Sequence, residues 1–548
     1  CEIIVHRPDF GGLSCTVFTK EPCGKTPEVF IGANGKISAM KKTERTLTRD
    51  QWATLILGLA LFFGLIIRLF PALLARFPLN DGGMFLSMIR DLRANGFVLP
   101  QFTSYNFADI PYAYPPFGFY LAAALSLLGL PDLEVLRWLP ALVNFASIPA
   151  FYLLANALLK DRPRAAVAAM IFALVPSSYG WQIMGGGLTR SLGLLFIILA
   201  LYAVYRMFEH GTWTFALLSM LFGALAVLSH PEAGLAAASA CALFWLAFGR
   251  TWRGTGQAVL VALGVAALTA PWWGSVLAMH GAAPFLSVLH SGQYTVNPIQ
   301  KLFHDLVRLD GYITLFYALM WIGLIWNLYK RQFFLPVWLA LHFFVEPRSA
   351  EAFAFLPACI LAAQTLVDVL SALMDRVRKS ATVPDFTQRK GWTLFLLGLM
   401  LLWFVQSGLY DFALINTSLI PPAPQAMLEW VRENTSSDAR FLVLTGQASV
   451  MIDPLQEWFP ALAERHSLTT QQGYEWTLGV DFFPRLDQLS ALQECLDAAC
   501  VEAWVAESGS SFDYALVSKE QAAGLISSFQ QAGYHMVREN EAIALLKK

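Results

Sequence analysis

The sequence predicts an α-helical polytopic membrane protein with a small extracytoplasmic α/β domain at its C-terminus. Of its 548 residues, 56% are hydrophobic and 14% are charged, with a mean hydropathy of +0.51, whereas globular domains carry about 25% charge. Apolar runs, each near the roughly 20 residues needed to cross a bilayer, recur from residue 52 to residue 415. Beyond Pro421 these runs give way to short amphipathic and alternating patterns, which indicate an α/β domain.

The first 39 residues differ from the rest of the chain. They are mixed in composition and lack periodicity, so we expect residues 1–39 to be a leader that is disordered or not native. Met40 precedes a basic stretch and then an apolar helix, which is how an inner-membrane protein ordinarily begins, and Met40 is the expected start. A lipid anchor at Cys1 is the alternative, and it would put the leader outside, against those basic charges.

The membrane domain, residues 40–420, contains about eleven apolar runs that we expect to be transmembrane helices. They are residues 52–74, 134–159, 165–183, 188–208, 214–229, 232–249, 258–279, 311–329, 333–345, 352–373 and 392–415. A further run, 116–130, is short. Counting it as a crossing would move the basic segment 160–164 to the outer side, against the positive-inside rule. We therefore expect 116–130 to be a surface or re-entrant helix within one long outer loop of residues 75–133.

The basic segments then share one side of the membrane. They are residues 41–49, 160–164, 250–253, 330–331 and 376–390. Because Lys and Arg collect in cytoplasmic loops, we expect a multi-pass protein of the plasma (inner) membrane with a cytoplasmic N-terminus and an extracytoplasmic C-terminal domain. The net charge of −1 and its distribution give no reason to expect nucleic acid as a partner.

The C-terminal domain, residues 421–548, begins after a proline-rich exit from the membrane. The predicted elements are a helix at 427–435, strands at 440–446 and 512–518, a helix then a strand over 521–537, and a hairpin over 537–548. Cys495 and Cys500 would meet an oxidising environment there. The compartment favours a disulfide between them, but two cysteines five residues apart on one helix have poor geometry for that bond. The sequence therefore leaves the choice between a disulfide and two free thiols open.

Asp81 is the strongest single candidate for chemistry. It follows the first apolar run, among turn-forming residues, where a carboxylate can accept a proton from an attacking hydroxyl or hold a divalent cation. The structural alternative is a helix cap, since Asn80 or Asp81 before a helix from Met84 is a good capping sequence. Tyr114, at the following Tyr-Pro-Pro corner, is either an interfacial belt residue or part of the same site.

Three further outer turns carry polar residues. Gly185–Gly187 runs into a helix with Arg190, which could bind a phosphate through free N–H groups and the guanidinium, or simply reach the interface. His230 and Glu232 could ligate a metal or relay a proton, while a proline turn with a capping Glu232 is the alternative. Arg348 has the planar fork that suits a lipid phosphate, or a structural ion pair with acidic neighbours.

The order of these features resembles the GT-C class of membrane glycosyltransferases, which includes protein O-mannosyltransferases, aminoarabinose transferases and the catalytic subunit of oligosaccharyltransferase. The resemblance rests on Asp81 after the first span, a surface helix, Tyr114-Pro115-Pro116 before FGFYLAAALSLLGL, and Arg137 at the next long span. Glu346-Pro347-Arg348 before FAFLPACILAA and the soluble C-terminal tail continue it. The loose match covers most of residues 40–548 and indicates a bacterial or archaeal member.

The resemblance implies a sugar on a polyprenyl phosphate as the donor and leaves the acceptor, whether lipid, glycan or protein, open. It implies Asp81 as the catalytic or metal-binding carboxylate, with Mg or Mn as a candidate cation, and Arg348 as the phosphate ligand. Many members carry a second acidic residue in the turn that holds Arg190 here, and Glu232 is the expected substitute. Tyr114, Arg137, Arg190 and His230 complete the predicted substrate-binding set.

A second hypothesis is a non-enzymatic membrane protein, such as a lipid or polymer transporter or an assembly scaffold of the cell envelope. A transporter is expected to carry ionisable residues within its spans. In this sequence they gather instead at the predicted outer ends of the spans, which favours the transferase.

Overall fold

The computed structural model describes residues 47–291, 297–307, 314–373 and 385–548. In the N-terminal unit, Cys1–Thr48, it also describes the backbone of four short strands, which pair antiparallel in the order β1-β2-β3-β4. These strands are β1 (Ile4–His6), β2 (Ser14–Thr16), β3 (Val29–Ile31) and β4 (Ile37–Ala39). The predicted disorder of the leader otherwise concerns residues outside the described part.

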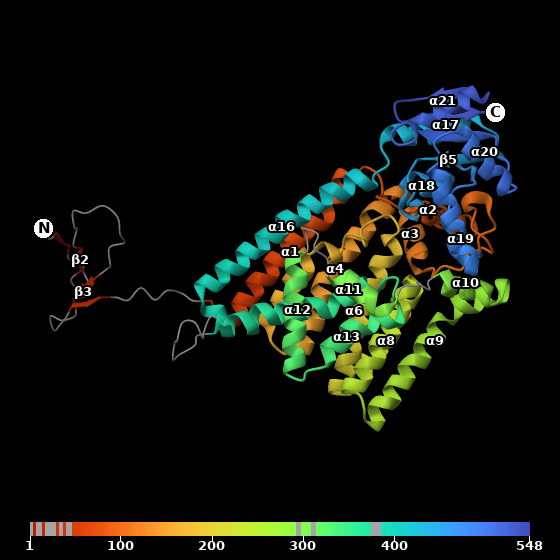
Figure 1. Ribbon diagram of the computed structural model, residues 1–548. Coiled ribbons are helices and arrows are strands. Elements are labelled where there is room, and N and C mark those ends of the chain that lie inside the picture. The colour runs from red at the N-terminus through yellow and green to blue at the C-terminus, as the bar shows by residue number, and fades with distance from the viewer. Residues whose placement is uncertain are drawn as a thin grey trace. The chain divides into compact units, whose positions relative to one another are not determined.

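The second unit, Arg49–Lys548, is built mainly from helices (Figure 1). Up to residue 418 these are α1 (Arg49–Leu74), α2 (Gly83–Ala94), α3 (Phe117–Leu127), α4 (Asp132–Leu159), α5 (Arg162–Leu174), α6 (Gly187–His210), α7 (Trp213–Ser229), α8 (Pro231–Phe248), α9 (Trp252–His280), α10 (Ala283–Ser291), α11 (Pro298–Leu306), α12 (Thr314–Tyr329), α13 (Phe334–Val345), α14 (Ala350–Gln364) and α16 (Lys390–Ser418). One apolar core of buried side chains joins α1, α4, α5, α6, α14 and α16.

Every apolar run that was predicted to span the membrane contains a helix. Within the described residues, seven helices are long and apolar enough to cross a bilayer, so the full number of crossings stays a prediction. The run at 165–183 differs from the expectation, because α5 ends at Leu174. Pro176 explains the end, since a proline disfavours helical geometry in the residue before it, and Val175 is extended with ψ 129°.

The run 116–130 forms the short helix α3 of 11 residues, and its position at the membrane surface stays a prediction. Ion pairs and hydrogen bonds show which helix ends lie together. Arg49 at the start of α1 pairs with Asp161, and Lys160 pairs with Glu209 at the end of α6. Asp81, beyond the other end of α1, instead meets the start of α6. Arg49 and Lys160 therefore lie at the end of the bundle opposite Asp81.

A mixed sheet follows the last long helix, with strand order β6-β5-β7-β9-β8. Its first three strands are parallel, and β9 runs antiparallel to both β7 and β8. The strands are β5 (Arg440–Leu444), β6 (His466–Ser467), β7 (Tyr514–Ser518), β8 (His535–Glu539) and β9 (Ile543–Lys547). The helices are α17 (Pro422–Asn434), α18 (Pro454–Ala463), α19 (Phe482–Gln493), α20 (Ala498–Glu507) and α21 (Ala523–Gln531).

Each element predicted for the C-terminal segment is present, including the β8–β9 hairpin. Strand β6 and helices α18, α19 and α20 were not predicted. In Figure 1, α2, α3 and α18 gather beside the sheet, and α2 packs directly on α18.

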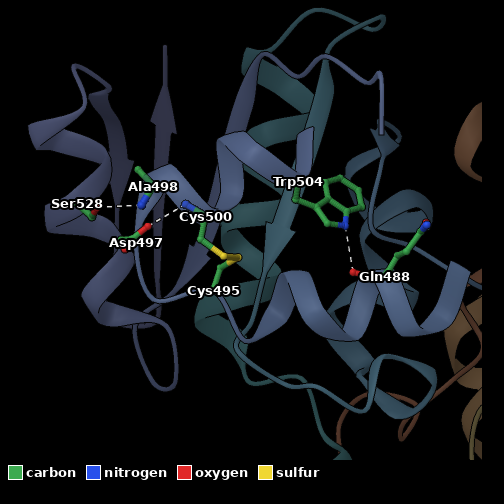
Figure 2. Close-up of a disulfide and its surroundings, with 7 residues drawn as sticks. All are labelled: Gln488, Cys495, Asp497, Ala498, Cys500, Trp504 and Ser528. Atoms are coloured by element: carbon green, nitrogen blue, oxygen red, sulfur yellow. Dashed lines mark hydrogen bonds between the residues drawn. A yellow bond between two sulfur atoms is a disulfide. The ribbon is translucent and has the colours of Figure 1, made fainter. Parts of the chain in front are cut away.

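Cys495 and Cys500 form a disulfide, with Cα atoms 5.6 Å apart (Figure 2). The poor geometry expected for one helix does not arise, because Cys495 follows the end of α19 and Cys500 lies in the first turn of α20. Asp497 caps α20 by accepting a hydrogen bond from the Cys500 N–H at 2.8 Å, which holds the turn between the two cysteines.

Candidate active site

The segment after α1 packs against the glycine turn before α6. The Gly185 N–H donates to the Leu79 carbonyl at 3.0 Å. A Cβ atom at Gly185 would lie 1.9 Å from the Asp81 carbonyl oxygen, and one at Gly186 would lie 2.4 Å from Asp81 Oδ2. Glycine is therefore required so that the two backbones can meet. The predicted phosphate-binding turn is occupied by the Asp81 loop.

Asp81 and Arg190 form a bidentate ion pair. Nη1 donates to Oδ2 at 2.7 Å and Nη2 donates to Oδ1 at 3.1 Å, while the Gly186 N–H also donates to Oδ1 at 2.9 Å. Arg190 Nε donates to the Trp181 carbonyl at 3.1 Å, and the guanidinium stacks 4.4 Å from the Trp181 ring centroid. The sequence analysis predicts that Arg190 binds a phosphate. In the structure its guanidinium binds the Asp81 carboxylate instead.

The Asp81 side chain does not cap α2, so the capping alternative is wrong. Gly82, with φ 127°, occupies the cap position without a side-chain bond. The cap comes from α18, where Glu457 Oε1 accepts hydrogen bonds from the N–H groups of Gly82 and Met84 at 3.3 Å each. Because Glu457 satisfies these donors, the Asp81 carboxylate points to Arg190 instead.

His230, Glu232 and Arg348 form a second charged group. Arg348 Nε lies 3.7 Å from Glu232 Oε1, and His230 Nδ1 lies 3.9 Å from Glu232 Oε2. The Ser349 hydroxyl donates to Glu232 Oε2. Glu232 also lies in the first turn of α8, after Pro231, as the structural alternative predicts, while a role in metal binding or proton relay stays a prediction.

The two charged groups line one cavity of about 340 Å³. It continues into a neighbouring cavity of about 310 Å³, and Trp181, Arg190, His230, Glu232, Arg348 and Ser349 line both. Tyr114 lies on the wall of the larger cavity, with its ring centroid 6.0 Å from His230 and 5.7 Å from Trp476. Asp81 and Arg348 stay partly accessible, with 21% and 33% of their side-chain surface exposed.

Burial changes the protonation of several groups around the cavity. It lowers the pKa of His230 to about 4, so this imidazole is neutral at pH 7. Burial, and then the Glu232 carboxylate, raise the pKa of Glu346 to about 9. Burial, and then Asp81, raise the pKa of Glu457 to about 8. Charge on the cavity wall is consequently concentrated in the Asp81–Arg190 and Glu232–Arg348 pairs.

Of the predicted site residues, Asp81, Tyr114, Arg190, His230, Glu232 and Arg348 come together at this cavity. Arg137 does not, and the structure corrects its expected place. It lies in α4, away from the described lining, where it pairs with Glu134 and donates to the Ala75 carbonyl at 3.2 Å. Its guanidinium therefore ties α4 to the end of α1.

Sequence reasoning missed the contribution of the C-terminal segment. Glu457, Glu475 and Trp476 all line the larger cavity, and Trp458 Nε1 donates to the Asn80 carbonyl at 2.9 Å. None of these residues lies in a motif. The stretch at 472–476, which combines Glu475 with Tyr474 and Trp476, is the one sequence signal that could have pointed to them.

The residues present do not fit a divalent cation at Asp81. A small divalent cation needs several oxygen ligands, yet both Asp81 oxygens accept hydrogen bonds from Arg190. Glu232 is taken by Ser349 and Arg348. Among the residues that the structure describes, no group of three or more His, Cys, Asp and Glu side chains is placed to hold a metal ion.

Comparisons with known proteins place this geometry in context. The model of the family described as dolichyl-phosphate-mannose-protein mannosyltransferase matches residues 113–274. No curated protein sequence matches the chain significantly. Solved structures, however, are similar over nearly the whole chain.

One is the oligosaccharyltransferase AglB of Archaeoglobus fulgidus, in complex with an inhibitory peptide and a dolichol-phosphate. The TM-score is 0.55 at 14% identity, over 91% of this chain and 74% of that one. Another is ArnT of Cupriavidus metallidurans, in the apo state (TM-score 0.53, 14% identity, 90% of this chain and 97% of that one). ArnT bound to undecaprenyl phosphate gives the same TM-score and identity over 91% and 98%. The chain has the fold of the GT-C class of polytopic membrane glycosyltransferases.

Proposed function

We propose that the protein is a glycosyltransferase that moves a sugar from a polyprenyl-phosphate donor to an acceptor hydroxyl on the extracytoplasmic face of the membrane. The observation that carries this proposal is the meeting of the Asp81–Arg190 and Glu232–Arg348 pairs in one cavity. The GT-C fold supports it, as do the polyprenyl phosphates bound to structures of that fold.

Arg348 and His230 are the proposed contacts of the donor phosphate. Arg348 is partly exposed and lies beside the partly exposed Glu232, which orients the guanidinium without enclosing it. The neutral imidazole of His230 can donate one hydrogen bond to a phosphate oxygen. Tyr114 and Trp476 supply the aromatic wall against which the apolar face of a sugar ring can pack.

Asp81 is the proposed partner of the acceptor hydroxyl. A carboxylate has about four lone-pair positions, and Arg190 and Gly186 occupy three of them, which leaves one for the acceptor O–H. The acceptor oxygen bonds to the anomeric carbon as the bond from that carbon to the phosphate oxygen breaks. The electron pair leaves on the polyprenyl phosphate, and the hydroxyl proton passes to Asp81.

The reaction is proposed for the outer face because the cavity lies at the end of the bundle opposite the basic residues Arg49 and Lys160. The disulfide between Cys495 and Cys500 in the adjoining C-terminal segment favours the same side, since disulfides persist in oxidising compartments.

The test is transfer of radiolabel from a panel of polyprenyl-phosphate sugars by the purified protein in nanodiscs, with solubilised native envelope as the acceptor source. Removing one general-base group lowers rates by about 10²–10⁴-fold, and we expect a loss of this size in Asp81→Asn. Asp487→Asn, an exposed aspartate on α19, is the matched control. Wild-type transfer by Asp81→Asn would contradict the site, and no transfer from any donor would contradict the activity.

The transporter hypothesis makes a different prediction in the same assay, because label would change sides while remaining on the polyprenyl phosphate. The structure does place ionisable residues within the helices, contrary to the expectation from sequence. Arg68 in α1 is fully buried, but Asn144 Oδ1 accepts from its Nε at 2.6 Å and Ser178 from its Nη2 at 3.1 Å. This arginine joins α1 to neighbouring segments, which is a structural role.

A further inference from the structure

We infer that Arg190 takes the place of a divalent cation at Asp81, so that sugar transfer by this chain needs no metal ion bound to that carboxylate. The reaction in this inference rests on the proposed function. The claim that no metal ion binds Asp81 rests on the contacts of Arg190. Those contacts account for each nitrogen of the guanidinium.

The guanidinium occupies the positions on Asp81 that a metal ion would use. Its two terminal nitrogens lie 2.7 and 3.1 Å from the two carboxylate oxygens. A magnesium ion binds such oxygens at about 2.0–2.1 Å in octahedral geometry. It would therefore have to displace Arg190 from both oxygens or approach a fixed positive charge at close range.

Arg190 is also held in place by its own surroundings. Its Nε donates to the Trp181 carbonyl at 3.1 Å, and the Trp181 ring covers one face. On another side Gly186 leaves room, since a Cβ there would lie 2.8 Å from Arg190 Nη1. With 12% of its side chain exposed, the guanidinium is fixed before any substrate binds.

The other acidic groups of the cavity are already engaged. Glu457 Oε1 caps α2, and Glu475 Oε2 accepts from the Gly473 N–H at 2.9 Å. Glu232 accepts from Ser349 and faces Arg348. No carboxylate on this wall combines with Asp81 into a ligand set, and the described residues contain no cluster of three or more His, Cys, Asp or Glu side chains that could hold a metal ion.

A fixed guanidinium can do the electrostatic work of a cation here. The leaving polyprenyl phosphate is an anion, and a bare carboxylate beside it would repel it. Arg190 cancels the charge of Asp81 and offers a preorganised positive charge where negative charge develops. Because the positive charge belongs to the chain itself, this arrangement does not depend on the concentration of any metal ion.

Two measurements test the inference. The first is the transfer rate of the full-length protein before and after treatment with EDTA, with Mn²⁺ or Mg²⁺ added back. We expect less than about a twofold change, whereas a metal acting as Lewis acid contributes far more. The second is Mn²⁺ binding followed by electron paramagnetic resonance, in the wild type and in Asp81→Asn, which needs no donor. We expect the same spectra from both proteins.

Variants of Arg190 test the contribution of its positive charge separately from that of the Asp81 carboxylate. Arg190→Met should lower transfer by about 10²–10³-fold, as for removal of one preorganised donor, and Arg190→Lys should fall in between because it keeps charge without the fork. Arg206→Met is the control, since Arg206 lies on the same helix and pairs with Glu209 at its other end. Elution profile and melting temperature confirm that each variant is folded.

Three results would overturn the inference: loss of transfer on chelation with recovery on adding Mn²⁺, Mn²⁺ binding that disappears in Asp81→Asn, or wild-type transfer by folded Arg190→Met. If no donor supports transfer, the proposed function fails, while the Mn²⁺ spectra still decide whether Asp81 holds a metal ion.

Discussion

Gly186→Ala is the sharpest perturbation of the site that the structure offers. Gly186 has φ −67° and ψ −8°, which alanine adopts without strain, so any effect comes from the added methyl group alone. That group would lie 2.4 Å from Asp81 Oδ2 and 2.8 Å from Arg190 Nη1. Relief requires a shift of about 1 Å, and a misplacement of that size can cost about 10²-fold in rate.

We therefore expect Gly186→Ala to lower the transfer rate by about 10²-fold while destabilising the protein by about 1–3 kcal/mol, as overpacking does. The assay pairs transfer of labelled sugar with thermal unfolding in nanodiscs. Gly58→Ala is the control, because a Cβ on Gly58 in α1 meets no described atom within 4 Å. Its rate should be unchanged. A folded Gly186→Ala protein with wild-type turnover would refute the assigned geometry of Asp81 and Arg190.

Three further predictions concern pH, the disulfide and Arg137. The folded protein holds the Glu457 proton up to about pH 8, whereas the ordinary value is 4.5, so its free energy of unfolding should fall as pH rises through that window. Glu457→Gln should flatten this fall in melting curves recorded between about pH 5 and pH 9, and an unchanged slope would contradict the burial of this carboxyl. Reducing the Cys495–Cys500 disulfide, which spans 5 positions, should cost about 2 kcal/mol of stability by the chain-entropy relation and leave transfer unchanged; a loss of activity would show that α19 and α20 contact the substrate. Arg137→Met should lower the melting temperature, since it breaks bonds to Glu134 and Ala75, but shift the donor KM by less than about twofold, as for a residue outside uniform substrate binding; a larger shift in KM would restore Arg137 to the site.

Much of the site could be predicted from sequence because successive transmembrane helices alternate in direction, so that every second loop lies on the same side of the membrane. Once the parity of the spans put Asp81, Arg190, His230 and Arg348 on one side, their meeting required only that the intervening helices pack together. The positive-inside rule supplied that parity through the basic loops, and the surface or re-entrant position that it gives for the short run 116–130 stays a prediction.

The predictions that differ from the structure concern residues whose contacts leave no recognisable pattern in the neighbouring sequence. Glycines at 185–187 suggest a phosphate loop, but their use is steric and depends on a backbone more than 100 residues away. Glu457 caps α2 across a separation of 375 residues, so its role cannot be read from its own neighbourhood. Arg137 has the residue type and the sequence position expected of a substrate-binding residue, but its guanidinium forms an ion pair with the neighbouring Glu134.

The cap on α2 also sets an order of events during synthesis. The Asp81 loop leaves the ribosome 375 residues before the Glu457 side chain that closes it. At about 5–20 residues per second, the loop waits roughly 20–75 s without that cap. A ribosome that stops after α16 would leave the Asp81 loop without the Glu457 cap. Completion of the last quarter of the chain is thus the step that closes the Asp81 loop.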